Sequence, residues 1–461
     1  MDGTRIRLAE IIEALSKALD LTEGQPQGHC IRVCYIGTRL GERIGLDQQE
    51  LNDLYYTLLL KDLGCSSNAA RICQLYLTDD LTFKKDFKLV DGSLGQVLRF
   101  VIGHTGMRAG LADRFRAILN VLQNGGQFAT DLIQTRCQRG AEIARMMRFS
   151  DGVADGIASL DEHWNGGGQP QQLKADQIPL FSRIALLAQV ADVFWASGGP
   201  EAAAEEVARR SGSWFDPRLA TEFAPLAADA GFWVTLSSPK LEAEVLNSEP
   251  GQQIVLADED YLDDIAAGFA KVIDAKSPYT SGHSERVALF TDLIAEEMGL
   301  DIENRRLLKR AALLHDIGKL GVSSTVLDKP GKLDGDEWEQ MKRHSEFSEN
   351  ILSNVDAFAG AALIGGAHHE RLDGTGYPRG LTADAIPMEV RIVSTADVFD
   401  ALTADRPYRA AMPVAEAMEI LWQGAGKSHD PICIEALERA LARTALAKHL
   451  QDEATPEFAA A

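Results

Sequence analysis

The stretch from Arg305 to Lys319, RRLLKRAALLHDIGK, carries an apolar stripe that ends at a histidine and an aspartate. Apolar residues recur at the same spacing of three and four in SERVALFTDLIAEEMGL (284–300) and EVRIVSTADVFDALTA (389–404). That period places them on one face of a helix. No convincing run of alternating apolar and polar residues, the period of a strand, is present. The sequence therefore predicts an all-α fold.

The composition limits the class of protein. With 461 residues, of which 45% are hydrophobic and 25% charged, the chain suits two or three globular domains. Its formal charge of −22 argues against binding polymeric nucleic acid, which requires a broad basic face. No apolar run approaches the roughly 20 residues needed to cross a bilayer, so we expect no membrane association. The N-terminus lacks a signal-peptide core and the six cysteines show no paired zinc spacing, so we predict a cytoplasmic protein without disulfides.

The two halves of the chain contain the same blocks in the same order, which indicates a tandem duplication. His29 and Lys61 are 32 residues apart, as are His283 and His315. The match between the two ADVF segments, 191–194 and 396–399, requires three extra residues in the first copy. The matched blocks are GHCIRV (28–33) with GHSERV (282–287), LLLKDLGCSS (58–67) with ALLHDIGKLGVSS (312–324), the segment 164–184 with 372–392, ADVF (191–194) with ADVF (396–399), and GSWFDP (212–217) with GKSHDP (426–431).

The duplication predicts two helical domains. The first copy occupies 1–236. Residues 237–260 are acidic, contain Pro and Gly, and have weak periodicity, which favours a linker. The second copy follows at 261–445, and 446–461 form a tail.

Seven residues of the second copy have the chemistry of metal ligands and lie where the helical period points inward. Burying so many ionisable groups without a metal would cost several kcal/mol each. The seven are His283, His315, Asp316, His344, His368, His369 and Asp397.

This set of ligands predicts a site with more than one divalent cation. Imidazole and carboxylate suit Fe, Mn or Zn, and the lack of a thiolate disfavours a structural zinc, so we predict two divalent ions, with Fe or Mn preferred. Two neighbouring ions bind the oxygens of a phosphodiester, lower the pKa of a bridging water and stabilise the leaving alkoxide. We expect Asp316 to bridge both ions and Lys319, one helical turn after His315, to offset charge on the phosphate.

The motifs around these residues resemble a known family. His315 to Lys319, HDIGK, resembles the HD signature of metal-dependent phosphohydrolases, and His368 to Pro378, HHERLDGTGYP, matches the HHExxDGxGYP signature of the HD-GYP subfamily. The resemblance covers 261–441. It implies an HD-GYP helical bundle preceded by a degenerate HD-like copy. It also implies hydrolysis of cyclic dinucleotides, chiefly cyclic di-GMP, to linear pGpG, with further cleavage to GMP left open.

The resemblance also implies roles for particular residues. The same seven positions become the metal ligands, and Lys319 lies near the scissile phosphate. Tyr377 of the GYP loop and Arg406 become substrate contacts. Some family members hold a third metal with a glutamate four residues before the first histidine. This chain has Tyr279 there, which favours a dinuclear site.

The first copy has lost most of these residues. Lys61 replaces His315, Cys65 replaces Lys319, and Leu160-Asp161 replaces the histidine pair, whereas His29 and Asp62 remain. The positive charge of Lys61 would repel a metal ion. The first copy is therefore predicted to be a pseudo-enzyme that regulates, dimerises or senses.

Two alternatives to the cyclic di-GMP hypothesis stay open. One is a 3'3'-cyclic GMP-AMP phosphodiesterase with the same metals, because the sequence does not place the residues that read the base. The other is a non-catalytic signalling module whose GYP loop docks diguanylate cyclase domains. Metal identity, a third metal and homodimerisation are also left open.

Overall fold

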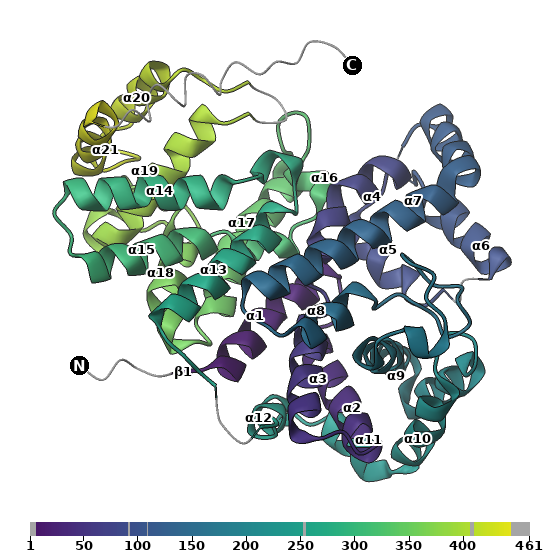
Figure 1. Ribbon diagram of the computed structural model, residues 1–461. Coiled ribbons are helices and arrows are strands. Elements are labelled where there is room, and N and C mark those ends of the chain that lie inside the picture. The colour runs from purple at the N-terminus through teal and green to yellow at the C-terminus, as the bar shows by residue number, and fades with distance from the viewer. Residues whose placement is uncertain (1–5, 91–92, 108, 252–254, 406–409, 444–461) are drawn as a thin grey trace. The chain divides into compact units, whose positions relative to one another are not determined.

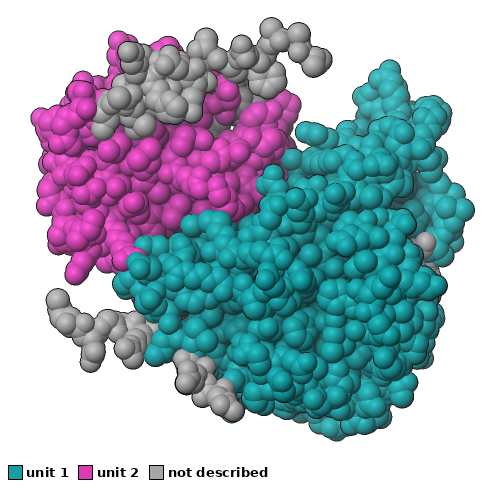
Figure 2. Space-filling view, in the orientation of Figure 1, with its two compact units in different colours: residues 1–268 teal, residues 269–461 magenta. Residues whose placement is uncertain are grey.

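The structure is a computed structural model that describes residues 6–90, 93–107, 109–251, 255–405 and 410–443. The chain divides into two compact units, residues 1–268 and 269–461 (Figure 2). Both units are built from helices, which confirms the all-α prediction (Figure 1). In the described residues the only strands are β1 (Ile6–Arg7) and β2 (Leu256–Ala257), which pair antiparallel.

The first unit contains the helices of the first copy, and α13 (Glu259–Asp274) crosses the boundary between the units. Its other helices are α1 (Leu8–Thr22), α2 (His29–Arg43), α3 (Gln48–Leu60), η1 (Cys65–Asn68), α4 (Ala69–Tyr76), α5 (Asp80–Phe87), α6 (Leu94–His104), α7 (Leu111–Met146), α8 (Asp151–Ala158), η2 (Ala175–Gln177), α9 (Leu180–Arg210), α10 (Pro217–Ala228), α11 (Ala230–Leu236) and α12 (Leu241–Asn247).

The second unit continues after α13 with further helices, five of which carry the predicted ligands, either within the helix or at its end. They are η3 (Pro278–Thr280), α14 (His283–Glu297), α15 (Ile302–Leu314), η4 (Ile317–Gly321), α16 (Ser324–Leu327), α17 (Gly335–Leu352), η5 (Asp356–Phe358), α18 (Ala359–Ala367), η6 (Ala383–Ala385), α19 (Met388–Thr403), α20 (Val414–Gln423) and α21 (Pro431–Arg443).

Matching helices in the two units begin with the same local chemistry. α2 and α14 each start at a histidine that follows a glycine in the left-handed region, Gly28 with φ 84° and Gly282 with φ 68°. A side chain at this φ would be strained, so the glycine lets the chain turn sharply into the helix. α3 and α15 are each capped by an aspartate, Asp47 and Asp301, whose carboxylate accepts from backbone N–H groups of the first turn. The duplication predicted from sequence is therefore visible in the helix starts.

The hydrogen bonds correct one of the sequence matches. Asp192 accepts a 2.6 Å hydrogen bond from His29 Nδ1, and Asp400 accepts a 2.6 Å hydrogen bond from His283 Nδ1. Asp192 therefore corresponds to Asp400, and the pairing of Asp192 with Asp397 was wrong. The four identical letters ADVF favoured a shift by three residues, close to one helical turn, whereas the buried partner of each aspartate requires an alignment without a gap.

Helix α9 corrects the expectation that no apolar run is long enough to cross a membrane. Among the described residues it is the one helix that meets this test by length and composition. However, 61% of its apolar window is buried within the protein, and Gly199, with φ 83° and ψ −171°, breaks its helical geometry. It is packed as a core helix of the first unit, because its apolar side chains meet those of neighbouring helices.

The segment predicted as a linker, 237–260, includes a short helix. In α12, Leu241 and Val245 are buried, so this part of the segment packs as folded structure. The six cysteines all lie in the described residues, and none of them forms a disulfide. The predicted tail, 446–461, lies outside the described residues.

Candidate metal centre

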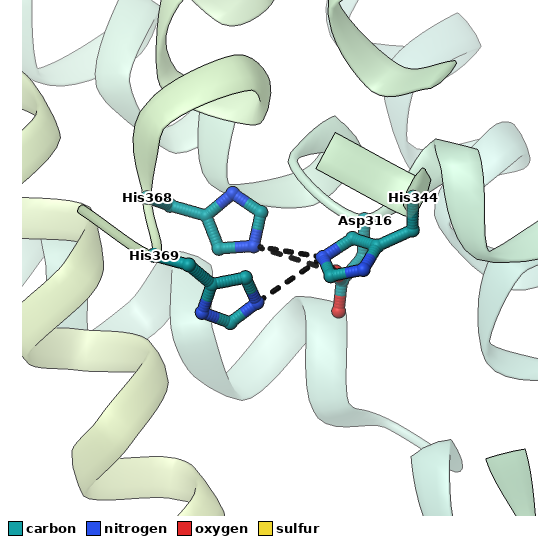
Figure 3. A group of neighbouring side chains, drawn as sticks. All are labelled: Asp316, His344, His368 and His369. Atoms are coloured by element: carbon teal, nitrogen blue, oxygen red, sulfur yellow. Dashed lines mark hydrogen bonds and ion pairs between the residues drawn. The ribbon is translucent and has the colours of Figure 1, made fainter. Parts of the chain in front are cut away.

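The second unit brings all seven predicted ligands together in two groups. Within each group the candidate ligand atoms lie within 4.8 Å of one another. Figure 3 shows the three imidazoles of the larger group and the one carboxylate gathered around a common point. One group comprises His283, His315 and Asp397, and the other comprises Asp316, His344, His368 and His369.

Five helices contribute these side chains, mostly from their ends. His283 is the first residue of α14, and His315 ends α15 with Asp316 directly after it. His344 and Asp397 lie within α17 and α19. The remaining pair, predicted to be helical, instead lies at the end of α18: His368 caps this helix and His369 follows it. Side chains at helix ends can come together from distant parts of the sequence without interrupting the helices of the bundle.

Asp316 lies between the two groups. Its Oδ2 is 3.5 Å from His283 Nε2 and 3.3 Å from His315 Nε2. Its Oδ1 is 3.5 Å from His344 Nε2 and 3.6 Å from His368 Nε2. Each carboxylate oxygen thus faces a different pair of imidazoles, which is the position predicted for a bridging ligand.

Several buried polar atoms at the centre have no hydrogen-bond partner that the described residues supply. Within the described residues, His283 Nε2, His315 Nε2 and Asp316 Oδ1 have no hydrogen-bond partner. Leaving such atoms unpaired away from water is costly. Nitrogen and carboxylate donors at this separation fit divalent transition metals, so these residues satisfy the requirements of the predicted metal site.

The other ring nitrogen of each of four histidines is held by a hydrogen bond. An Nδ1 that donates a proton leaves the Nε2 lone pair free to face the centre. The acceptors are Asp400 for His283 at 2.6 Å, Ala312 O for His315 at 2.7 Å, Met341 O for His344 at 2.6 Å, and Gly365 O for His368 at 3.0 Å.

The charges around His283 favour a cation at this end of the site. Burial disfavours the protonated form of His283, yet the carboxylates of Asp316, Asp400 and Asp397 raise its pKa to about 9. On the other side, burial lowers the pKa of His344 to about 3. A neutral imidazole is the form that binds a metal. The carboxylates that stabilise a proton on His283 would equally stabilise a metal ion in its place.

The predicted substrate contacts lie beside the ligands where the structure describes them. Lys319 Nζ donates to the Asp316 carboxylate. The Tyr377 ring is 4.7 Å from the His369 ring, which places the GYP loop against the centre. Tyr279, 37% exposed, lies on η3 just before α14. Arg406 lies outside the described residues.

Two functional carboxylates were missed by the sequence reasoning. Asp400 holds His283, and it also accepts from Arg286 Nε. Glu370 accepts backbone N–H bonds from Arg379 at 2.7 Å and Leu381 at 2.8 Å, which braces the loop that carries Tyr377. In the first copy, Asp192 and Glu162 stand at the equivalent positions and make the same bonds. The presence of the same carboxylates in both copies was the sequence signal that could have identified Asp400 and Glu370.

Replacing Asp400 with asparagine is expected to lower kcat/KM for phosphodiester hydrolysis by about 10- to 100-fold, because the tautomer and orientation of His283 are then less well held. Metal content measured on the same samples should fall in parallel. Asp192→Asn is the matched control, since it breaks the same bond in the first copy, and it should change hydrolysis less than about threefold. Equal losses in both variants would contradict this role for Asp400.

In the first copy, a lysine of the chain occupies the position between the retained residues. Lys61 Nζ is 3.2 Å from His29 Nε2 and forms a buried ion pair with Asp62. Burial and the charge of Lys61 lower the pKa of His29 to about 4, so this imidazole is neutral. Gln189 stands where the second copy has Asp397. The first copy thus has an ammonium group at the point where the second copy has imidazole nitrogens without a hydrogen-bond partner among the described residues.

A third group of potential ligands, Glu23, Asp62 and Cys65, also lies in the first unit. Its carboxylates are paired with lysines, Glu23 with Lys88 at 2.8 Å and Asp62 with Lys61. These ion pairs already balance the charge that a cation would need. The pseudo-enzyme role of this copy stays a prediction.

Comparisons with known proteins show which family this chain belongs to. A family model described as an HD domain matches residues 107–219 and 269–432. The 3'3'-cGAMP-specific phosphodiesterase 3 of Vibrio cholerae is 52% identical over 434 residues, which cover 94% of each chain. The cyclic di-GMP phosphodiesterase response regulator RpfG of Xanthomonas campestris pv. campestris is 44% identical over 176 residues, 38% of this chain and 47% of that protein.

A solved structure is similar over nearly the whole chain. The crystal structure of V-cGAP3, a cyclic GMP-AMP specific phosphodiesterase of V. cholerae, shares 46% identity and covers 95% of this chain and 99% of its own, with a TM-score of 0.66. Both copies of the duplication therefore have counterparts in known proteins. The chain belongs to the HD-GYP family of HD-domain phosphohydrolases and is a cyclic dinucleotide phosphodiesterase.

Proposed function

We propose that the preferred substrate is 3'3'-cyclic GMP-AMP, which was the alternative to cyclic di-GMP at the level of sequence. The observation that carries this choice is the similarity over 94% of both chains to a 3'3'-cGAMP-specific enzyme. The cyclic di-GMP phosphodiesterase RpfG matches 38% of this chain. A relative that shares the whole two-copy architecture is a better guide to specificity than one that shares a single domain.

The proposed site holds two divalent ions, iron or manganese, with Asp316 between them. When bound, such ions activate water and stabilise the charge that develops on the phosphate. The residues of the chain orient the substrate: Lys319 is positioned to neutralise a phosphate oxygen, and Tyr377 forms a wall beside His369. Tyr279 in place of a carboxylate supports two ions over three, so cleavage should stop at the linear dinucleotide.

The test is a comparison of both cyclic dinucleotides on protein purified anaerobically, with products separated by chromatography. We expect kcat/KM for 3'3'-cyclic GMP-AMP to exceed that for cyclic di-GMP by at least about tenfold, a difference that a few base contacts supply. Metal analysis should find two ions per chain. The reverse preference would establish the cyclic di-GMP hypothesis in its place. Failure to cleave either substrate, with bis(p-nitrophenyl) phosphate still cleaved, would refute both.

Docking of diguanylate cyclase domains through the GYP loop, homodimerisation and a cytoplasmic location remain predictions. Each is independent of the assay above.

A further inference from the structure

A cleft in the second unit opens directly beside the metal centre. It has a volume of about 680 Å³ and lies between η3, the segment after α16 and the start of α17. Lys319, which contacts Asp316, forms part of its wall. Pockets that bind small molecules usually measure about 300–1,000 Å³. The cleft is therefore large enough for a nucleotide, and it begins beside the candidate metal ligands.

The charge of the cleft differs from that of the protein. The chain has 68 acidic and 46 basic residues, yet three lysines and no carboxylate line this cleft. Lys319 pairs with Asp316 and Lys329 pairs with Glu337. Lys332 has no ion-pair partner among the described residues and is exposed. An exposed lysine without an ion-pair partner, in a cleft whose lining has no carboxylate, can attract an anion and favours a phosphate-bearing ligand.

Aromatic rings connect the metal centre with the cleft. The Trp338 ring meets the Tyr377 ring edge to face at 5.6 Å, and the Tyr377 ring lies 4.7 Å from that of His369. Trp338 is 44% exposed, although a large aromatic surface favours burial. Tyr279 also lines the cleft, so the residue in place of the glutamate adds an uncharged wall there. Exposed aromatic rings beside lysines are the usual platform for stacking nucleobases.

We propose that this cleft binds the half of the cyclic dinucleotide that is not being cleaved, with its purine stacked on Trp338 and its phosphate held by Lys332. This inference rests on the proposed function, because it assigns a place to the second nucleotide of that substrate. The metal centre holds the scissile phosphate, and the 12-atom ring of the substrate keeps its second phosphate within a short distance. Trp338 and Lys332 thus act in binding, whereas the reacting atoms lie at the seven ligands.

The test measures steady-state kinetics of the full chain with the cyclic dinucleotide that the wild type cleaves and with bis(p-nitrophenyl) phosphate, which has no purine. For Trp338→Ala, we expect KM for the cyclic dinucleotide to rise at least about tenfold with kcat changed less than about threefold. The loss in kcat/KM should be at least about tenfold greater for the cyclic dinucleotide than for bis(p-nitrophenyl) phosphate. Trp338→Phe should recover most of the affinity, since phenylalanine still stacks.

Trp422→Ala is the matched control, because Trp422 is exposed to a similar extent, 40%, on α20 of the same unit and does not line this cleft. It should leave both activities unchanged. Lys332→Ala should raise KM several-fold, most strongly at low salt, and Lys332→Arg should restore it. An unchanged KM in Trp338→Ala, or an equal loss on both substrates, would overturn the inference. Wild-type protein that cleaves no cyclic dinucleotide would instead refute the proposed function, and this inference with it.

Discussion

Replacing Asp316 with asparagine is expected to lower kcat/KM for the cyclic dinucleotide at least about 1,000-fold and to remove most of the bound metal. The carboxylate faces imidazoles of both groups, with Oδ2 3.3 Å from His315 Nε2 and Oδ1 3.5 Å from His344 Nε2. An amide has nearly the same shape, but it lacks the negative charge and provides one good ligand oxygen. Substitution of a residue that hydrogen-bonds to a metal ligand lowers metal affinity or activity about 10- to 100-fold. Loss of a ligand shared by two ions should lower both by a larger factor.

The measurement is metal quantitation together with hydrolysis, on protein whose helical content matches the wild type. Asp356→Asn, at an exposed position on η5 of the same unit, is the control and should change neither quantity. Full metal content with full activity in Asp316→Asn would show that Asp316 does not bridge the ions.

The second large effect concerns the stability of the first copy. Replacing Lys61 with methionine is expected to lower the free energy of unfolding of this unit by about 3–5 kcal/mol, because the buried Asp62 is left without its partner. Burial raises the pKa of a lone carboxyl, but here the charge of Lys61 keeps the pKa of Asp62 below its usual value. The measurement is denaturant unfolding followed by circular dichroism and tryptophan fluorescence, analysed with separate transitions for the two units.

A double variant distinguishes the ion pair from general packing. Replacing both Lys61 with methionine and Asp62 with asparagine removes the two charges together, so it should recover much of the stability lost in Lys61→Met. A double variant as unstable as the single one would show that lysine packing, and not its charge, stabilises the site.

The sequence predicted the ligand set because the relevant residue types are rare and their spacing is specific. Five of the ten histidines belong to the candidate ligand set of the second copy, and three of them lie in the HDIGK and HHERLDGTGYP motifs. The helical period also predicted the fold class. Asp400 was not found in this way, because the sequence around an aspartate on a helix does not show whether its side chain faces solvent or a buried histidine. Its role depends on which helix lies opposite.

The match of Asp192 with Asp397 failed for a related reason. Four identical letters appeared to decide the alignment, yet a shift of three residues nearly preserves the face of a helix, so periodicity did not reveal the error. The bonds that Asp192 accepts from His29 and Arg32, which match those of Asp400, established the register. The bond from His29 shows that the first copy makes the aspartate–histidine contact found in the second copy, with Gln189 in the position of Asp397.

By itself, the sequence determined the all-α class, the duplication, the seven candidate ligands and the copy that contains them. These follow from residue type and spacing along the chain. The tertiary structure decided what lies between the ligands: Asp316 between both groups, Lys61 at the centre of the first copy, and the lysine-lined cleft beside Trp338. Distances between side chains, burial and local charge depend on how helices far apart in sequence pack, and a linear pattern does not contain that information.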